Sequence, residues 1–172
     1  YGESGGQKGD TGTMTDEENV ANVTDTIKPN PALYVHAVEV TKGSLCIDRE
    51  VTLAVNRERR MAMARYHSAT HLLQAALRKV LGSHVKQAGS LVDPDHLRFD
   101  FSHIQAMTPD EIAAVEREVN AAILADMPVT TEVMDHDEAM KTGAMALFSE
   151  EGGKMGRAAC RERGEISVFA VF

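Results

Sequence analysis

Two histidines four residues apart are the side chains of this sequence best suited to bind a metal ion. His67 and His71 lie in a stretch with helical periodicity, and side chains at positions i and i+4 of a helix can chelate one zinc ion. The spacing also arises by chance, and the alternative is two partly exposed helix histidines. Zinc proteases need a glutamate after the first histidine, whereas this sequence has Ser68 there, so proteolysis is excluded.

The helix that carries the two histidines is predicted to run from near Asn56 to about Leu81, with Gly82 as its C-terminal cap. Apolar residues at three- and four-residue spacing predict one buried stripe, made of Ala69, Leu72, Leu73, Ala76, Leu77, Val80 and Leu81. A rotation of about 100° per residue places His67 and His71 about 40° apart and roughly opposite that stripe. We therefore expect the histidines, with Met63 and Gln74 beside them, to lie away from the main core.

The net charge of −8 over 172 residues opposes nonspecific attraction to a polyanion, so any nucleic-acid contact must be local. The arginines gather in two groups that are candidates for phosphate contacts. The first contains Arg57, Arg59, Arg60 and Arg65, and the second contains Arg157, Arg161 and Arg163. The alternative for each is a place on a solvated charged surface.

Two cysteines in a chain of this size indicate that no disulfide framework holds the fold, which favours a reducing compartment. The sequence has no apolar run long enough to span a bilayer and no signal-peptide pattern at its start. From these features we expect a cytoplasmic protein with no membrane contact. The first and last residues, Tyr1 and Phe172, suggest a piece cut from a longer chain.

The remaining pattern predicts an α+β fold with a small antiparallel β unit (residues 1–56) followed by a domain of helices packed on a mainly antiparallel sheet (residues 57–172). Residues 1–13 are glycine-rich and predict a loop in which backbone approaches another group closely. Thr108, Pro109 and Glu111 form a capping box that begins a second helix, ended by Pro128. Strands are predicted at 33–40, 45–47, 51–55, 90–92, 97–102 and 128–134, and a short helix at 135–141.

Several motifs, in order along the chain, resemble the editing region of alanyl-tRNA synthetases, which is related to free-standing alanyl-tRNA editing proteins. The resemblance covers nearly the whole chain. It rests on Gly2-Glu3-Ser4-Gly5-Gly6-Gln7, Arg65-Tyr66-His67-Ser68-Ala69-Thr70-His71, Val85-Lys86-Gln87-Ala88-Gly89-Ser90, Arg98-Phe99-Asp100-Phe101 and Gly143-Ala144-Met145-Ala146-Leu147-Phe148.

The resemblance implies a deacylase that hydrolyses the ester of seryl- or glycyl-tRNA(Ala) at the tRNA acceptor end. It implies one zinc ion on His67, His71 and two further ligands, and a pocket that contains Gln87 and is bordered by Gln7 and Thr11. Arg59, Arg60 and Arg65 are then candidates for tRNA contacts. Aminoacylation with ATP would belong to a separate domain of the same full-length chain.

The sequence departs from the family where a Cys-x-x-x-His element completes the metal site. Family spacing puts Met155 at the cysteine and Ala159 at the histidine, and neither replaces the lost ligand well. Cys160 is a candidate substitute ligand, and the stretch between Phe148 and Met155 is shorter than the family usually has. Two alternatives are therefore a tRNA-acceptor-binding module with a degenerate metal site and a free-standing deacylase.

Overall fold

The computed structural model describes residues 1–134 and 157–161. The chain divides into two compact units, one made of residues 1–67 and 89–99 and the other of residues 68–88 and 100–172. Each unit is described here by itself. The boundary after residue 56 that the sequence suggested stays a prediction.

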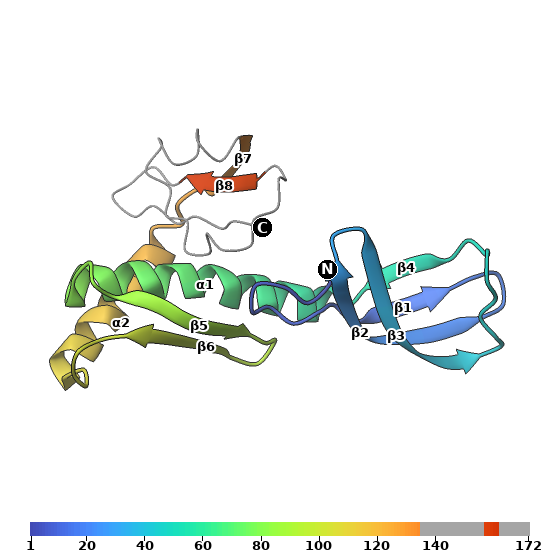
Figure 1. Cartoon of the computed structure of the whole chain (residues 1–172), viewed down its shortest axis with the longest axis horizontal. Helices are drawn as coiled ribbons and strands as arrows, with labels where there is room; N and C mark the ends of the chain where they lie inside the picture. The colour runs from blue at the N-terminus through green and yellow to red at the C-terminus, as the bar shows by residue number, and fades with distance from the viewer. Residues whose placement is uncertain (135–156, 162–172) are drawn as a thin grey trace. The chain divides into compact units, whose positions relative to one another are not determined.

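The first unit contains a four-stranded antiparallel sheet in the order β3-β2-β1-β4 (Figure 1). Its strands are β1 (Gly12–Thr15), β2 (Val20–Asn30), β3 (Leu33–Lys42) and β4 (Thr52–Val55). Buried Ala21 and Val23 alternate with exposed Asn22 and Thr24 on the central strand β2. This alternation is typical of an antiparallel sheet with one covered face.

Sequence analysis predicted only part of this sheet. Strands β1 and β2 were both missed. In β2 the pairing with β3 shifts between Val23 and Asp25, and such a bulge breaks the period of two. The strand predicted at 45–47 is wrong. Gly43 has a φ of 73°, Asp48 has a φ of 61°, and Ile47 is 92% exposed, so this stretch forms a loop in which only Leu45 is partly buried.

Helix α1 (Arg57–Leu81) confirms the predicted long helix. Asn56 caps its first turn, because its Oδ1 accepts a hydrogen bond of 3.0 Å from the backbone N–H of Arg59. At the other end Gly82 has a φ of 113° and its N–H donates to the carbonyl oxygen of Arg78 at 3.0 Å. The left-handed conformation ends the helix where glycine was expected to do so.

The buried face of α1 differs from the predicted one. Met63, Thr70, Gln74 and Leu77 are all buried, and their spacing of seven, four and three residues places them on one face. Met63 and Gln74 were expected away from the core, and of the predicted stripe only Ala76 and Leu77 are fully buried. The apolar pattern was misleading because polar Thr70 and Gln74 occupy buried positions.

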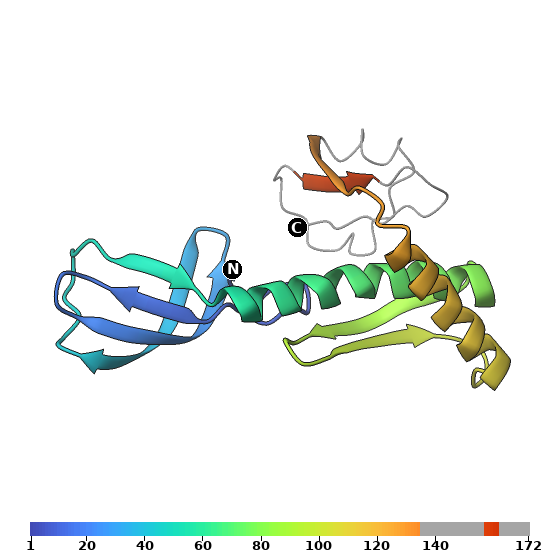
Figure 2. The same cartoon turned by 180° about the vertical axis from the view of Figure 1, so that it is seen from behind.

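The second sheet pairs β5 (Lys86–Val92) with β6 (Leu97–Ser102), and the third pairs β7 (Thr130–Met134) antiparallel with β8 (Arg157–Arg161). Figure 2 shows the β5–β6 hairpin from behind. Helix α2 (Pro109–Leu124) has the predicted capping box, in which Thr108 Oγ1 accepts from the Glu111 N–H and Glu111 Oε2 accepts from the Thr108 N–H. The α+β class is confirmed, as small sheets rather than one main sheet.

Some predicted features lie outside the described residues. These are the short helix at 135–141, the motif at 143–148 and Met155. Within residues 1–134 and 157–161, no helix is both long and apolar enough to cross a membrane.

Candidate functional site

The glycine-rich loop at the start of the chain lies directly against β5. The N–H of Val92 donates to the carbonyl oxygen of Gly6 at 2.7 Å, and the N–H of Lys8 donates to the carbonyl oxygen of Val92 at 3.1 Å. Gly6 has a φ of 81°, and a Cβ on it would lie 2.5 Å from the Ser90 carbonyl oxygen. The expected close backbone approach is confirmed here, since only glycine fits both the conformation and the space.

Asp10 joins the end of this loop to α1. Arg60 donates to both carboxylate oxygens, with Nε 2.9 Å from Oδ1, and the Asp10 side chain is only 5% exposed. Burial by itself would raise the pKa of Asp10, but hydrogen bonds from Arg60 and from the Tyr1 amino group outweigh it and hold that pKa below its ordinary value. The carboxylate therefore stays charged and keeps Arg60 at the loop.

Gln7 contacts one of the two histidines. Gln7 is buried, and its Oε1 lies 2.7 Å from Nδ1 of half-buried His67. An amide oxygen only accepts, so this contact places a proton on Nδ1 and makes Nε2 the nitrogen that can act as an acceptor or ligand in the neutral ring. Burial lowers the pKa of His67, which favours that neutral form.

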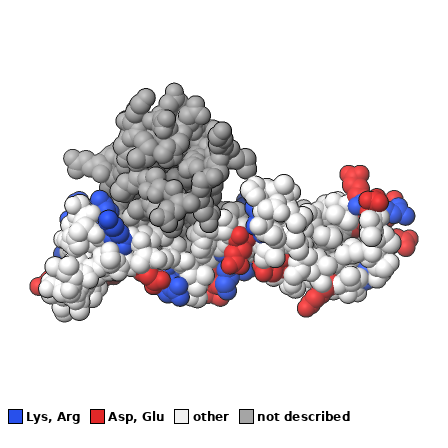
Figure 3. All heavy atoms as spheres, in the orientation of Figure 1, with Lys and Arg blue, Asp and Glu red and all other residues white. Residues whose placement is uncertain are grey.

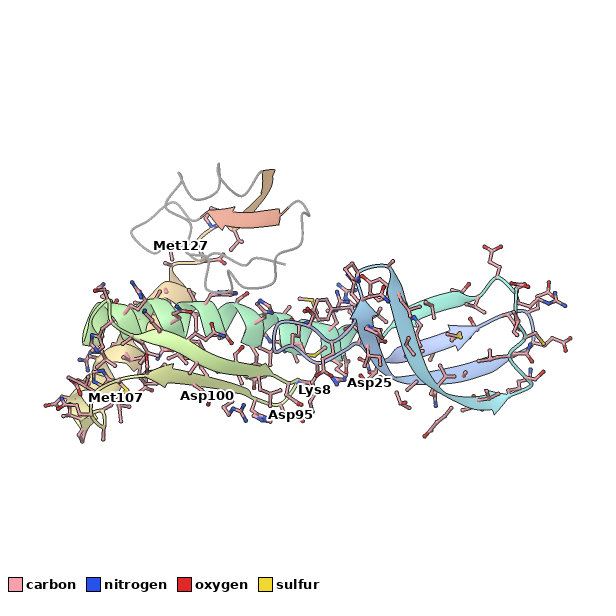
Figure 4. All side chains as sticks on the ribbon, in the orientation of Figure 1. Lys8, Asp25, Asp95, Asp100, Met107 and Met127 are labelled. Carbon is pink, nitrogen blue, oxygen red and sulfur yellow. The ribbon has the colours of Figure 1, made fainter. Side chains whose placement is uncertain are left out.

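A further ion pair holds the loop at the turn between β5 and β6. Lys8 Nζ lies 2.7 Å from Asp93 Oδ2, and the hydrogen bond from Lys8 lowers the pKa of Asp93. Figure 4 shows Lys8 close to this turn, where Asp95 also lies. Gln7, Lys8 and Asp10 thus each contact a different side chain outside the loop, namely His67, Asp93 and Arg60.

The other residues expected in a pocket lie on the same elements or close to them. Thr11 accepts a backbone hydrogen bond of 2.8 Å from the Asn56 N–H, which ties the loop to the start of α1. His71 is half-buried one turn after His67 on α1, and Gln87 is half-buried in β5. The roles of Gln7, Thr11 and Gln87 in a reaction stay predictions.

Of the three predicted tRNA contacts, Arg65 is exposed, while Arg59 and Arg60 are half-buried on the first turn of α1. Arg60 is held by Asp10, as described above, and Arg59 Nη1 lies 3.8 Å from the Met63 sulfur. On the face of the molecule drawn in Figure 3, basic and acidic side chains are interspersed over the described residues.

Comparison with known protein sequences shows which proteins this chain resembles. A family model described as tRNA synthetases class II (A) matches residues 1–59. Alanine–tRNA ligase of Nitratidesulfovibrio vulgaris is 60% identical over 153 residues, which are 89% of this chain and 17% of that protein. The chain is similar to one segment of alanine–tRNA ligases.

Two further relatives agree. Alanine–tRNA ligase of Oleidesulfovibrio alaskensis is 60% identical over 151 residues, covering 88% of this chain and 17% of that ligase. The ligase of Lawsonia intracellularis is 48% identical over 157 residues, covering 91% of the chain and 18% of the ligase. The chain thus spans less than a fifth of the alanine–tRNA ligases it matches.

The expected assignment to an editing region, with deacylation of seryl- or glycyl-tRNA(Ala) as its function, is wrong. The family model that matches is that of the class II synthetases, whose activity is aminoacylation, and it covers the loop, the four-stranded sheet and the start of α1. The sequence motifs indicated alanine–tRNA ligase. Motifs alone, however, do not show the arrangement of side chains that would distinguish hydrolysis of aminoacyl-tRNA from attachment of the amino acid to tRNA.

The described residues do not complete the zinc site that the resemblance to the ligases implied. Among them there is no group of three or more His, Cys, Asp or Glu side chains placed to share one ion. Structural zinc sites need four protein ligands and catalytic sites need three. His67 and His71 alone would therefore bind a zinc ion only weakly. Cys160 and Ala159 lie in β8, paired with Thr131 and Glu132. Zinc ligation by Cys160 stays a prediction.

Sequence reasoning missed several polar contacts in this chain. Asp10 and Arg60 are 50 residues apart in the chain, and no local pattern links them. His84 Nε2 lies 2.9 Å from His103 Nδ1, and the Nε2 atom of His103 is buried with no hydrogen-bond partner among the described residues. Histidine spacing of 19 residues has no helical or strand period that would have signalled the pair.

Proposed function

We propose that this chain is part of an alanine–tRNA ligase, and that within the longer protein it belongs to the class II synthetase portion that attaches alanine to tRNA. The observation that carries the proposal is 60% identity to an alanine–tRNA ligase over 89% of the chain. The match of residues 1–59 to the class II synthetase family supports the aminoacylation side of that activity.

The geometry supports a positioning role for the loop and α1. Asp10 binds Arg60, Gln7 binds His67 and Lys8 binds Asp93, so residues 7–10 are held against α1 and the β5–β6 turn by three side-chain contacts. A loop fixed in this way can present its backbone to a substrate without a large entropic cost on binding. We assign this loop to the support of the aminoacylation site rather than to proton transfer.

The function is tested with the full-length protein that contains this sequence. ATP-dependent attachment of radiolabelled amino acids to bulk tRNA should show alanine as the preferred substrate, with serine and glycine attached far less. Preferred attachment of any amino acid other than alanine would overturn the proposal, and so would the absence of attachment by a folded full-length protein.

We propose that Arg65 contacts the phosphate backbone of tRNA, because it is an exposed arginine on α1, two residues before His67, which contacts the loop residue Gln7. Arg65→Gln in the full-length protein should weaken tRNA binding and lower the dependence of log Kd on log salt by about one contact. Arg117→Gln removes the same charge from an exposed position of α2 and is the matched control. An equal effect of both variants would show that only net charge matters.

Zinc at His67 and His71 is tested by metal analysis. Because two histidines alone form a low-affinity site, we expect the 172-residue chain to lose zinc to a mild chelator. One zinc per chain that survives chelation in the parent protein and is lost in His67→Ala would show that further ligands exist outside the described residues.

A further inference from the structure

The four-stranded sheet has two chemically different faces, which its register defines. On one face Val40, Ala21, Met14 and Leu53 pair across the strands, and Val38, Val23, Gly12 and Val55 form the next row. We call these two rows the apolar face. Between them, Glu39, Asn22, Thr13 and Ala54 form a row that points to the opposite side, because neighbouring residues of a strand alternate in direction.

The apolar face is covered at its centre and open at its edges. Ala21 is 0% and Val23 is 6% exposed on the central strand, whereas Val40 on β3 and Leu53 and Val55 on β4 are 48%, 49% and 49% exposed. An antiparallel sheet normally buries its apolar face and leaves its polar face in water. Half-exposed valine and leucine therefore lie on both edge strands, one on each side of a covered centre, and exposed apolar side chains on strand edges are typical of interfaces.

The rest of the longer protein is the occupant that the observations favour. The chain spans 17–18% of the alanine–tRNA ligases it matches, so most of such a protein lies outside these residues. The class II synthetase model matches residues 1–59, which contain all four strands of this sheet. A sheet that belongs to a larger domain is expected to bury its apolar face against that domain.

We propose that the edges of the apolar face, formed by Val40, Leu53 and Val55, pack against the remainder of the class II synthetase domain in the full-length ligase. This inference rests on the proposed function in one respect, namely that the chain is part of a longer synthetase. Val40, Leu53 and Val55 stay about half exposed within the described residues, and the proposal places them at an interface.

Side-chain footprinting with hydroxyl radicals on the full-length protein is the first test. After correction for intrinsic reactivity, Leu53 and Val55 should be modified several-fold more slowly than Ile47, which is 92% exposed in the loop before β4. In the 172-residue chain the difference should shrink, because both side chains are half exposed there. Equal protection in the two proteins would overturn the inference, since a segment of this chain would then cover the face.

A matched pair of lysine substitutions on β4 is the second test. Leu53→Lys places a charge on the apolar face, while Ala54→Lys places the same charge on the opposite, exposed face of the same strand. In the full-length protein Leu53→Lys should lower the midpoint of thermal unfolding by about 4 °C or more beyond the Ala54→Lys value. Equal midpoints for the two variants would overturn the inference.

Other results separate the alternatives. Protection that disappears on dilution to a monomer would assign the face to a second copy of the chain and overturn our proposal. Unprotected Leu53 in a protein that attaches alanine to tRNA would refute the interface and leave the proposed function intact. Protected Leu53 in a protein that attaches a different amino acid would refute the proposed function and leave the interface intact.

Discussion

The contact between Gln7 and His67 shows how one hydrogen bond selects the tautomer of a neutral imidazole. The amide oxygen lies 2.7 Å from Nδ1, so the neutral ring carries its proton there and presents Nε2 as the acceptor. From sequence alone the two histidines were equivalent members of a motif. The structure distinguishes His67 by a buried partner from the opening loop, 60 residues away in the chain.

At this residue scale we predict a pH dependence of stability. Burial lowers the pKa of His67 from 6.5, so the unfolded chain binds a proton more readily than the folded one. The free energy of unfolding should therefore be highest above pH 6.5 and should fall as the pH decreases from 6.5 towards the lower folded pKa. Urea unfolding of the 172-residue chain at pH 5.0–7.5 measures the slope.

His67→Gln should reduce that slope by removing the buried titrating group. The control is His96→Gln, because His96 is exposed. If both variants keep the slope of the parent protein, the buried imidazole is not its source.

At the scale of elements, the loop at residues 1–11 and strand β5 are joined by backbone rather than by side chains. Gly6 and Val92 share a hydrogen bond of 2.7 Å, and the backbone at Gly6 leaves no space for a Cβ. The glycine-rich composition predicted such an approach, but the sequence did not identify the partner strand. Helix α1 illustrates the same limit, since its ends were predicted and its buried face was not.

Two neighbouring glycines test the importance of this contact. Gly5→Ala meets only the strain of a positive φ of 57°, because no atom lies within 4 Å of its Cβ, whereas Gly6→Ala adds a clash with Ser90. We expect Gly5→Ala to cost about 1 kcal/mol and Gly6→Ala about 2–4 kcal/mol in the free energy of unfolding. Denaturant unfolding of both variants measures the difference, and equal losses would mean that the loop moves away from β5 freely.

At the scale of the whole molecule, distant segments are joined by a few charged and polar contacts. Asp10 is 5% exposed while the Arg60 side chain is 41% exposed, so solvent screens the pair from one side only. Arg60, one of the predicted tRNA-binding arginines, is thus a partner of Asp10, and its contact with tRNA stays a prediction. The chain also covers only 17–18% of its ligase relatives, and apolar side chains on both edge strands of its four-stranded sheet are half exposed.

A double-mutant cycle measures what this ion pair contributes. Asp10→Asn, Arg60→Gln and the double variant should give a coupling energy of about 1–2 kcal/mol, reduced from the value for a fully buried pair because Arg60 is partly exposed. The stabilisation should be present above the ordinary pKa of aspartate and lost as the pH falls through the lowered pKa of Asp10. A coupling energy near zero at neutral pH would show that the contact does not hold the loop.

Local structure in this protein was determined by local sequence. The cap at Gly82, the capping box at Thr108 and the length of α1 depend on residues within one or two turns, and each was predicted correctly. The motifs also indicated alanine–tRNA ligase, and the relatives agree. The tertiary structure decided which face of α1 is buried and that Asp10 holds Arg60. These outcomes depend on contacts between residues far apart in the chain, where burial and charge pairing outweigh the local pattern of apolar residues.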